Sequence, residues 1–202
     1  MSLSLLRQFD SLLIRLTHPI RHLDGLPALA LRLYLVPVFW MAGSQKFLHF
    51  QDTVDWFGSP DYGLGLPFPM LMAALATAAE LGGAILLALG LATRWISIPL
   101  LVTMLVAIFA VHIDNGWQAI ADPSGPFANA QVLASAEKLE RIRDILQEYG
   151  NYDWLTASGS VAILNNGIEF AVTYAVMLLA LMVMGGGRYV SADYWLARWL
   201  RS

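Results

Sequence analysis

Apolar residues lie in four long blocks that polar stretches separate, and this pattern indicates helices that span a membrane. A block of about twenty residues, rising about 1.5 Å per residue, crosses about 30 Å of hydrocarbon. The predicted spans run over about residues 27–47, 67–91, 95–113 and 167–185. The pattern therefore predicts an all-α fold, a polytopic membrane four-helix bundle in which residues 1–202 form a single membrane domain.

The segment between the third and fourth predicted spans, residues 114–166, is too long for a hairpin turn and too polar for a span. From Asn129 to Tyr149 apolar residues recur at helical spacing, and Gly150 follows where a helix would end. We therefore expect a helical insertion on the extracytoplasmic side. Its apolar face either covers the mouth of the bundle or docks a partner.

Before the first span, leucines and charged residues recur at helical spacing: Leu3, Leu6, Arg7, Asp10, Leu13, Arg15 and Leu16. This pattern indicates either an amphipathic helix on the membrane surface or a short soluble helix packed on the end of the bundle. The segment has no long apolar core and no small-residue cleavage site, so we expect no cleaved signal peptide.

The flanks of the predicted spans differ in basic residues. One side holds most of the arginines: Arg7, Arg15, Arg21, Arg94, Arg188, Arg198 and Arg201. Because cytoplasmic flanks carry an excess of Lys and Arg, this side is predicted to be cytoplasmic. We therefore expect a multi-pass protein of the bacterial inner membrane with both termini in the cytoplasm.

Composition supports the membrane prediction and narrows the chemistry. The chain is 57% hydrophobic and 13% charged, whereas an ordinary soluble domain carries roughly a quarter charged residues. The net charge is −3 and no basic run occurs, which excludes a nucleic-acid surface. The absence of cysteine excludes thiolate chemistry and Cys-ligated clusters from this chain alone, so any redox carrier comes from elsewhere.

Charged residues inside the predicted spans are the candidates for a site. Glu80 is the only charge in the second span, and an ionised carboxylate near mid-membrane costs about 2.5–3.5 kcal/mol. Counted along the helices, Arg32 lies roughly 7 Å and Glu80 roughly 15 Å from the cytoplasmic end. This spacing predicts an Arg32–Glu80 pair.

A second polar cluster is predicted near the opposite face. Lys46, His112 and Glu169 fall there, with Asn115, Asn165 and Asn166 close in sequence. Their depths predict a Lys46–Glu169 pair. Both predicted pairs either form a functional site or only fix the packing of the helices.

Neither a metal nor a haem is favoured by the spacing of possible ligands. His49 and His112 are the one histidine pair that could share a membrane face, and histidines at helix ends usually meet water rather than iron.

The small residues of the second span, such as Ala79, Gly82 and Gly83, permit a homodimer and equally serve packing within one chain.

Several short motifs together resemble the DoxX family of small four-helix membrane proteins: Arg32-Leu33, Gly43-Ser44-Gln45-Lys46, Glu80-Leu81-Gly82-Gly83, Gly90-Leu91 and Thr93-Arg94. The resemblance implies a link to redox chemistry, because the name-giving member looks like the small membrane subunit of a thiosulfate:quinone oxidoreductase. Arg32, Lys46, Glu80 and Arg94 match the family's polar positions, and nothing carries over for His112 or Glu169. The long insertion is similar to the HvfX-type branch, which is associated with maturation of copper-binding modified peptides.

The leading functional prediction is a membrane subunit of a redox-linked or peptide-maturation system, at most one subunit of an oxidoreductase. A polar pocket around Lys46 and Glu80 would be accessible to a quinone. The alternatives are a non-catalytic scaffold that holds protein partners at the membrane, and a transporter of small solutes or metals.

Overall fold

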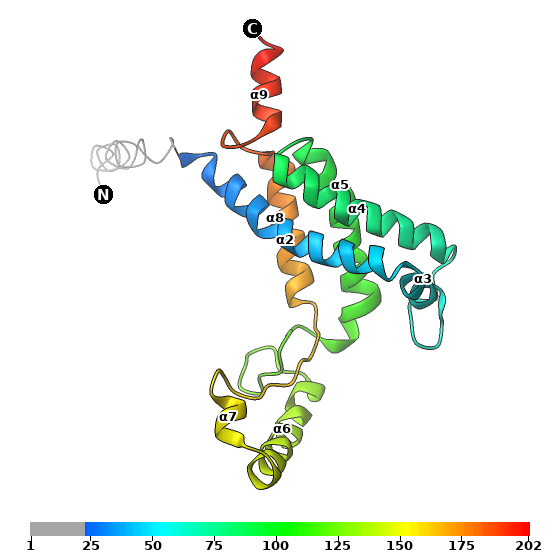
Figure 1. The fold of residues 1–202 in the computed structure, drawn as a ribbon, viewed down its shortest axis with the longest axis vertical. Coiled ribbons are helices and arrows are strands. Elements are labelled where there is room, and N and C mark those ends of the chain that lie inside the picture. The colour runs from blue at the N-terminus through cyan, green and yellow to red at the C-terminus, as the bar shows by residue number, and fades with distance from the viewer. Residues whose placement is uncertain (1–22) are drawn as a thin grey trace, which may run out of the picture. The chain divides into compact units, whose positions relative to one another are not determined.

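A computed structural model describes residues 23–202, so the amphipathic helix predicted near the N-terminus lies outside the described residues. The described chain is helical (Figure 1), with α2 (Leu26–Leu48), α3 (Phe50–Gly58), α4 (Pro69–Leu89), α5 (Thr93–Val106), α6 (Ala130–Tyr149), α7 (Tyr152–Thr156), α8 (Glu169–Met184) and α9 (Ala192–Trp199). A π-helical segment, Ala107–His112, and a 3-10 turn, Ile113–Asn115, extend α5.

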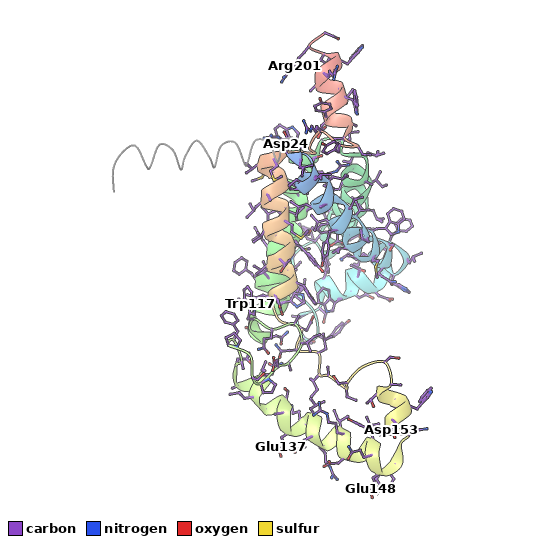
Figure 2. All side chains as sticks on the ribbon, turned by 90° about the vertical axis from the view of Figure 1, so that its left-hand side faces the viewer. Asp24, Trp117, Glu137, Glu148, Asp153 and Arg201 are labelled. Atoms are coloured by element: carbon purple, nitrogen blue, oxygen red, sulfur yellow. The ribbon has the colours of Figure 1, made fainter. Side chains whose placement is uncertain are left out.

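The chain divides into two compact units. The membrane unit comprises the described residues up to Thr103 together with Val176–Ser202, and the insertion unit comprises Met104–Ala175. The insertion unit contains α6 and α7, where Figure 2 labels Glu137, Glu148 and Asp153.

Three helical stretches among the described residues are long and apolar enough to cross a membrane: Leu26–Leu48, Pro69–Leu89 and Thr93–Asn115. They correspond to the first three predicted spans, and the all-α polytopic membrane fold is confirmed. The fourth predicted span, 167–185, is an apolar helix of only 16 residues, Glu169–Met184. At about 1.5 Å per residue it is about 24 Å long, shorter than the prediction.

The shortening of α8 has a local cause at each end. At its start, Gly167 and Ile168 donate their backbone N–H groups to the carbonyls of Gln118 and Gly116, so they join the preceding loop rather than the helix. At its end, Gly185 has φ +76°, a left-handed conformation that stops a helix.

Close contact between helices in the membrane unit depends on glycine. A Cβ on Gly83 of α4 would lie 2.8 Å from the side chain of Leu100 on α5. The apolar core of this unit comes from α2, α4, α5 and α8 and includes Leu35, Phe39, Ala73, Leu87, Leu100, Leu178 and Leu181. Many other apolar side chains remain exposed, including Leu33, Met41 and Trp95, as lipid-facing residues do.

The short helix α3 was not predicted, because its nine residues carry too few apolar positions to stand out as a helix. Residues after α3 fold back on it, with Leu64 and Leu66 donating to the carbonyls of Trp56 and Phe57. The polar connection between the first two spans is therefore made of α3 and the loop that packs on it.

The helix predicted in the insertion is confirmed as α6, Ala130–Tyr149. Asn129 caps its start by accepting a hydrogen bond from Val132 N at 2.8 Å, and Gly150 follows its end. Val132 is buried, whereas Ile142, Ile145 and Tyr149 are exposed. Whether this exposed apolar face covers the bundle or docks a partner stays a prediction.

Candidate functional site

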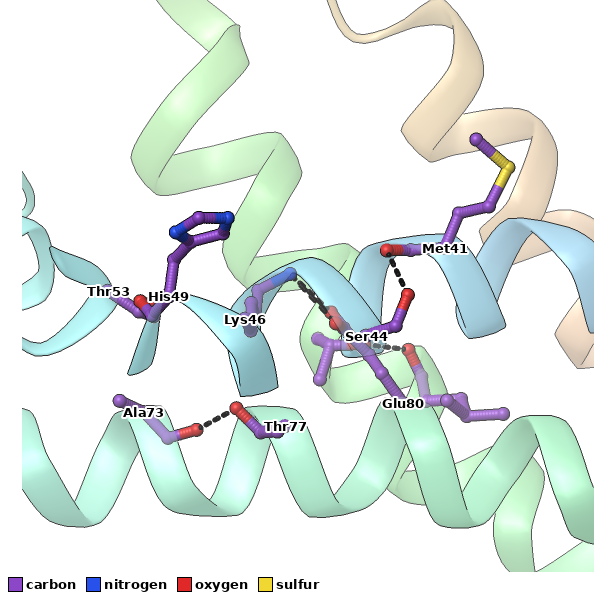
Figure 3. A network of polar contacts seen from close by, with 10 residues as sticks. Met41, Ser44, Lys46, His49, Thr53, Ala73, Thr77 and Glu80 are labelled. Atoms are coloured by element: carbon purple, nitrogen blue, oxygen red, sulfur yellow. Dashed lines mark hydrogen bonds and ion pairs between the residues drawn. The ribbon is translucent and has the colours of Figure 1, made fainter. Parts of the chain in front are cut away.

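A lysine–glutamate ion pair joins the first two spans. Lys46 Nζ on α2 lies 2.7 Å from Glu80 Oε2 and 3.1 Å from Glu80 Oε1 on α4. Figure 3 shows the two side chains pointing toward one another. The side chain of Glu80 is 5% exposed and that of Lys46 is 26% exposed, so the pair has a covered carboxylate and an ammonium that is partly open.

Gly43 brings the two helices close enough for this pair to form. A Cβ on Gly43 would lie 2.8 Å from Leu81 N and 3.0 Å from the Cβ of Glu80. Lys46 follows Gly43 by three residues, which places both on the same face of α2. The motif Gly43-Ser44-Gln45-Lys46 therefore meets the motif Glu80-Leu81-Gly82-Gly83 in space.

The predicted Arg32–Glu80 pair is wrong, because Glu80 pairs with Lys46 and Arg32 binds backbone carbonyls instead. Arg32 is 1% exposed and donates five hydrogen bonds. The acceptors are the carbonyl oxygens of Leu87 (2.7 Å), Ala88 (3.0 Å), Gly186 (2.8 Å), Tyr189 (3.5 Å) and Val190 (2.8 Å).

These contacts make Arg32 a clamp between the end of α4 and the loop after α8. The carbonyls of the last helical turn have no partner within the helix and carry the negative end of its dipole, so a cation there is favourable. Gly90 adopts φ +60°, and a Cβ there would lie 2.6 Å from the guanidinium of Arg32. Glycine alone adopts this positive φ without strain and has no Cβ to collide with the guanidinium.

Two residues that the sequence did not single out hold the same turn. Asp193 on α9 accepts hydrogen bonds from Ala92 N (2.6 Å) and Thr93 N (2.9 Å) and so caps the start of α5. Ser191 donates to the carbonyl of Gly90 at 3.1 Å. No spacing signal could reveal these contacts, because the partners lie about a hundred residues apart in the chain.

Arg94, the last family-matched position, is exposed. Its Nη2 donates a hydrogen bond to the carbonyl of Met184 at 3.4 Å. Arg94 therefore lies outside both the Lys46–Glu80 pair and the Arg32 clamp.

The polar residues of the insertion unit form a separate cluster. His112 Nδ1 lies 2.8 Å from the carbonyl of Asn166, which also accepts from Asn115 at 3.1 Å. Asn165 donates to the carbonyls of Asn115 and Gln118 at 2.8 and 2.7 Å. These bonds tie the end of the third span to the segment before α8.

The predicted Lys46–Glu169 pair is also wrong. Glu169 Oε2 accepts a hydrogen bond from Ala119 N at 2.9 Å, while Lys46 is bound to Glu80. Glu169 therefore secures the loop before α8 instead of pairing with a cation.

Within residues 23–202, no group of three or more His, Asp or Glu side chains is placed to hold a metal ion. The Lys46–Glu80 pair offers a different chemistry. The Lys46 ammonium donates to both oxygens of the Glu80 carboxylate, and its three N–H donors leave capacity for a further acceptor on its open side. A carbonyl oxygen of a small apolar molecule fits this donor.

Comparison with known proteins places the pair within a described family region. The DoxX family model matches residues 28–113. The Inner membrane protein YphA of Escherichia coli strain K12 is 33% identical over 96 residues, which cover 47% of this chain and 64% of that protein. The protein named Putative oxidoreductase CatD of Bacillus subtilis strain 168 is 35% identical over 94 residues, which cover 46% of this chain and 66% of that protein.

The chain therefore spans just under two thirds of the length of these curated relatives. No solved structure matches the chain significantly. The family match includes both members of the ion pair, the clamp arginine and the turn that it holds. Over residues 28–113, this multi-pass membrane protein is similar to the DoxX family.

Proposed function

We propose that this chain is the membrane subunit of a redox-linked system and that Lys46 and Glu80 form a polar site for a quinone that enters from the lipid. The single observation that carries the proposal is the ion pair itself, with Glu80 covered and the Lys46 ammonium partly open. A charged pair between spans is costly to place in a membrane, which favours a function for it.

The residues present fit a quinone headgroup. The ammonium of Lys46 can donate a hydrogen bond to a quinone carbonyl while it remains paired with Glu80. A bound quinone supplies two-electron chemistry that this cysteine-free chain lacks. Lys46 would orient the headgroup and favour negative charge on its oxygen, and Glu80 would hold the ammonium in place.

The electrons would be exchanged with a partner protein that carries its own redox group. A relative named as an oxidoreductase supports such an assignment. The finer assignment, to maturation of copper-binding modified peptides, rests on the likeness of the insertion to the HvfX-type branch.

A titration of purified protein with a short-chain ubiquinone or menaquinone, followed by quenching of tryptophan fluorescence, tests the site. We expect saturable quenching in the wild type and binding at least about tenfold weaker in Lys46→Met, because the ammonium donor is lost. Lys138→Met, an exposed lysine of α6, is the matched control and should bind as the wild type does. Absence of saturable binding, or equal binding by Lys46→Met, would remove the proposed site.

A second function, a scaffold for protein partners, is favoured by the exposed apolar residues of α6 and α7. Ile145, Tyr149 and Trp154 are 45%, 78% and 73% exposed. Exposed groups of apolar side chains commonly mark a surface that binds another protein. Cells that produce the chain with Ile145→Ser and Tyr149→Ser should lose partners that co-purify with the wild type. Retention of every partner would count against the scaffold.

We also propose that the protein lies in a bacterial inner membrane with both termini in the cytoplasm, because most arginines flank the spans on that side. The relative named as an inner membrane protein supports this location.

A further inference from the structure

The turn between α4 and α5 joins two consecutive spans and must therefore lie at a membrane–water boundary. The helix α9 is fixed to this turn, because Asp193 in its first turn accepts hydrogen bonds from Ala92 N and Thr93 N. The side chains of α9 next to the turn thus lie near the level of the lipid headgroups.

A cavity of about 460 Å³ opens between this turn, the end of α8 and α9. Arg94 lines it from α5, and Arg201, which Figure 2 labels, lines it from the two residues that follow α9 and its C-cap. An adjoining cavity of about 440 Å³ shares Arg201 and adds Arg198. Three arginines therefore surround one region of the membrane boundary.

The arginines keep most of their hydrogen-bonding capacity. Arg94 donates one long bond of 3.4 Å to Met184, although a guanidinium has five N–H donors. Arg198 lies over the ring of Trp195 at 5.9 Å. The side chain of Arg201 forms no hydrogen bond with any of the residues 23–202 that the structure describes.

One acid, Asp193, lines the cavity beside Arg94 and Arg201. Both carboxylate oxygens of Asp193 are occupied by the backbone N–H groups of Ala92 and Thr93. The two arginines outnumber this one carboxylate, so the lining of the cavity carries a net positive charge. It suits a ligand that carries a net negative charge and planar or tetrahedral oxygen acceptors.

The other residues that line the cavity include aromatic side chains typical of a membrane interface and a glycine next to Arg94. Trp95 is 76% exposed and Tyr194 is 37% exposed, which is typical of side chains at the membrane interface. Gly185 has φ +76°, and a Cβ there would lie 3.0 Å from Arg94 Nε, so glycine leaves room for the guanidinium.

We infer that this arginine cavity binds the phosphate group of an anionic phospholipid, with Arg94 and Arg201 as the principal donors. A glycerol headgroup such as that of phosphatidylglycerol fits, because it keeps the phosphate charge. The headgroups of phosphatidylcholine and phosphatidylethanolamine add a cation, which the two arginines repel.

The test measures the melting temperature of the purified full chain in a neutral detergent, with added phosphatidylglycerol, phosphatidylcholine or inorganic phosphate at equal concentration. We expect phosphatidylglycerol alone to raise the melting temperature. In the double variant Arg94→Gln/Arg201→Gln the lipid affinity should fall at least about tenfold. The control Arg141→Gln/Arg143→Gln removes two arginines from α6 and should respond as the wild type does.

Each outcome decides the inference. An equal response to inorganic phosphate would show a site for free anions, and an equal response to phosphatidylcholine would show general lipid binding; either result overturns the anionic-lipid site. A full response in Arg94→Gln/Arg201→Gln overturns it as well. If that variant melts early without lipid, Arg94→Lys/Arg201→Lys replaces it and should keep the preference for phosphatidylglycerol with reduced affinity.

Discussion

Gly43 on α2 and Glu80 on α4 lie so close together that a Cβ on Gly43 would be only 3.0 Å from the Cβ of Glu80. Because Lys46 lies on the same face of α2, three residues further on, this approach places its ammonium on the carboxylate. Packing between the spans and the charge pair are thus coupled.

The first prediction concerns this coupling. Gly43→Ala should destabilise the protein by about 1–3 kcal/mol, because the added methyl group forces α2 away from α4. Gly82→Ala is the matched control, since a Cβ there meets nothing within 4 Å, and it should be neutral or stabilise by up to about 1 kcal/mol. Unfolding in mixed detergent measures both. Equal effects of the two substitutions would contradict the close approach at Gly43.

The second prediction concerns the unequal burial of the pair. Lys46→Met leaves the covered carboxylate of Glu80 without its partner and should cost about 3–5 kcal/mol of unfolding free energy. Glu80→Gln should cost less, because the partly open Lys46 ammonium can turn toward water or lipid headgroups. The double variant Lys46→Met/Glu80→Met should be more stable than Lys46→Met alone. Additive losses in this double-mutant cycle would show that the two groups do not interact.

The third prediction concerns the Arg32 clamp. Arg32→Lys keeps the charge but has three N–H donors for five carbonyls, so it should destabilise the protein by about 2–4 kcal/mol. The exposed Arg94 serves as control, and Arg94→Lys should change the unfolding free energy by less than about 0.5 kcal/mol. If Arg32→Lys unfolds at the wild-type detergent concentration, the clamp contributes nothing to stability.

The fourth prediction concerns the cap on α5. Asp193→Ala removes the acceptor for Ala92 N and Thr93 N and should cost about 0.5–2 kcal/mol. Hydrogen exchange should speed up at these two amides. Asp144→Ala, an exposed acid on α6, should leave exchange there unchanged. Unaltered protection of Thr93 in the Asp193 variant would contradict the cap.

The fifth prediction concerns orientation, and it uses the absence of cysteine from the chain. A membrane-impermeant maleimide, applied to cells whose inner membrane is intact but whose outer barrier is permeabilised, should label Glu140→Cys in the insertion. It should label Ser202→Cys only after the inner membrane is broken. The reverse pattern would invert the topology expected from the arginine excess.

Apolar periodicity was enough to predict the three long helices and the helix of the insertion. The predicted spans 27–47, 67–91 and 95–113 correspond to Leu26–Leu48, Pro69–Leu89 and Thr93–Asn115. The helix predicted from Asn129 to Tyr149 is α6. These elements could be predicted because a long apolar run or a regular stripe is a local property of the chain.

The partners of the charges could not be predicted from depth along the helices. From Arg32 to Gly43 the chain rises about 16 Å along α2, whereas their neighbours Leu87 and Leu81 are about 9 Å apart along α4. The two helices therefore do not run level, and equal depth is a poor guide to contact. A buried cation also need not pair with an acid: Arg32 donates its hydrogen bonds to five backbone carbonyls.

The Arg32 clamp has a consequence for the order of assembly. Arg32 belongs to α2, which leaves the ribosome before α8, whereas three of its acceptors, the carbonyls of Gly186, Tyr189 and Val190, are synthesised after α8. Until then the Arg32 guanidinium lacks these three acceptors, and an incompletely hydrogen-bonded charge within the membrane raises the free energy of the chain. Its last hydrogen bonds form only when translation has passed Val190. The clamp thus couples stability to completed synthesis, and chains that stop earlier would expose an unfinished helix end to proteases that survey the membrane.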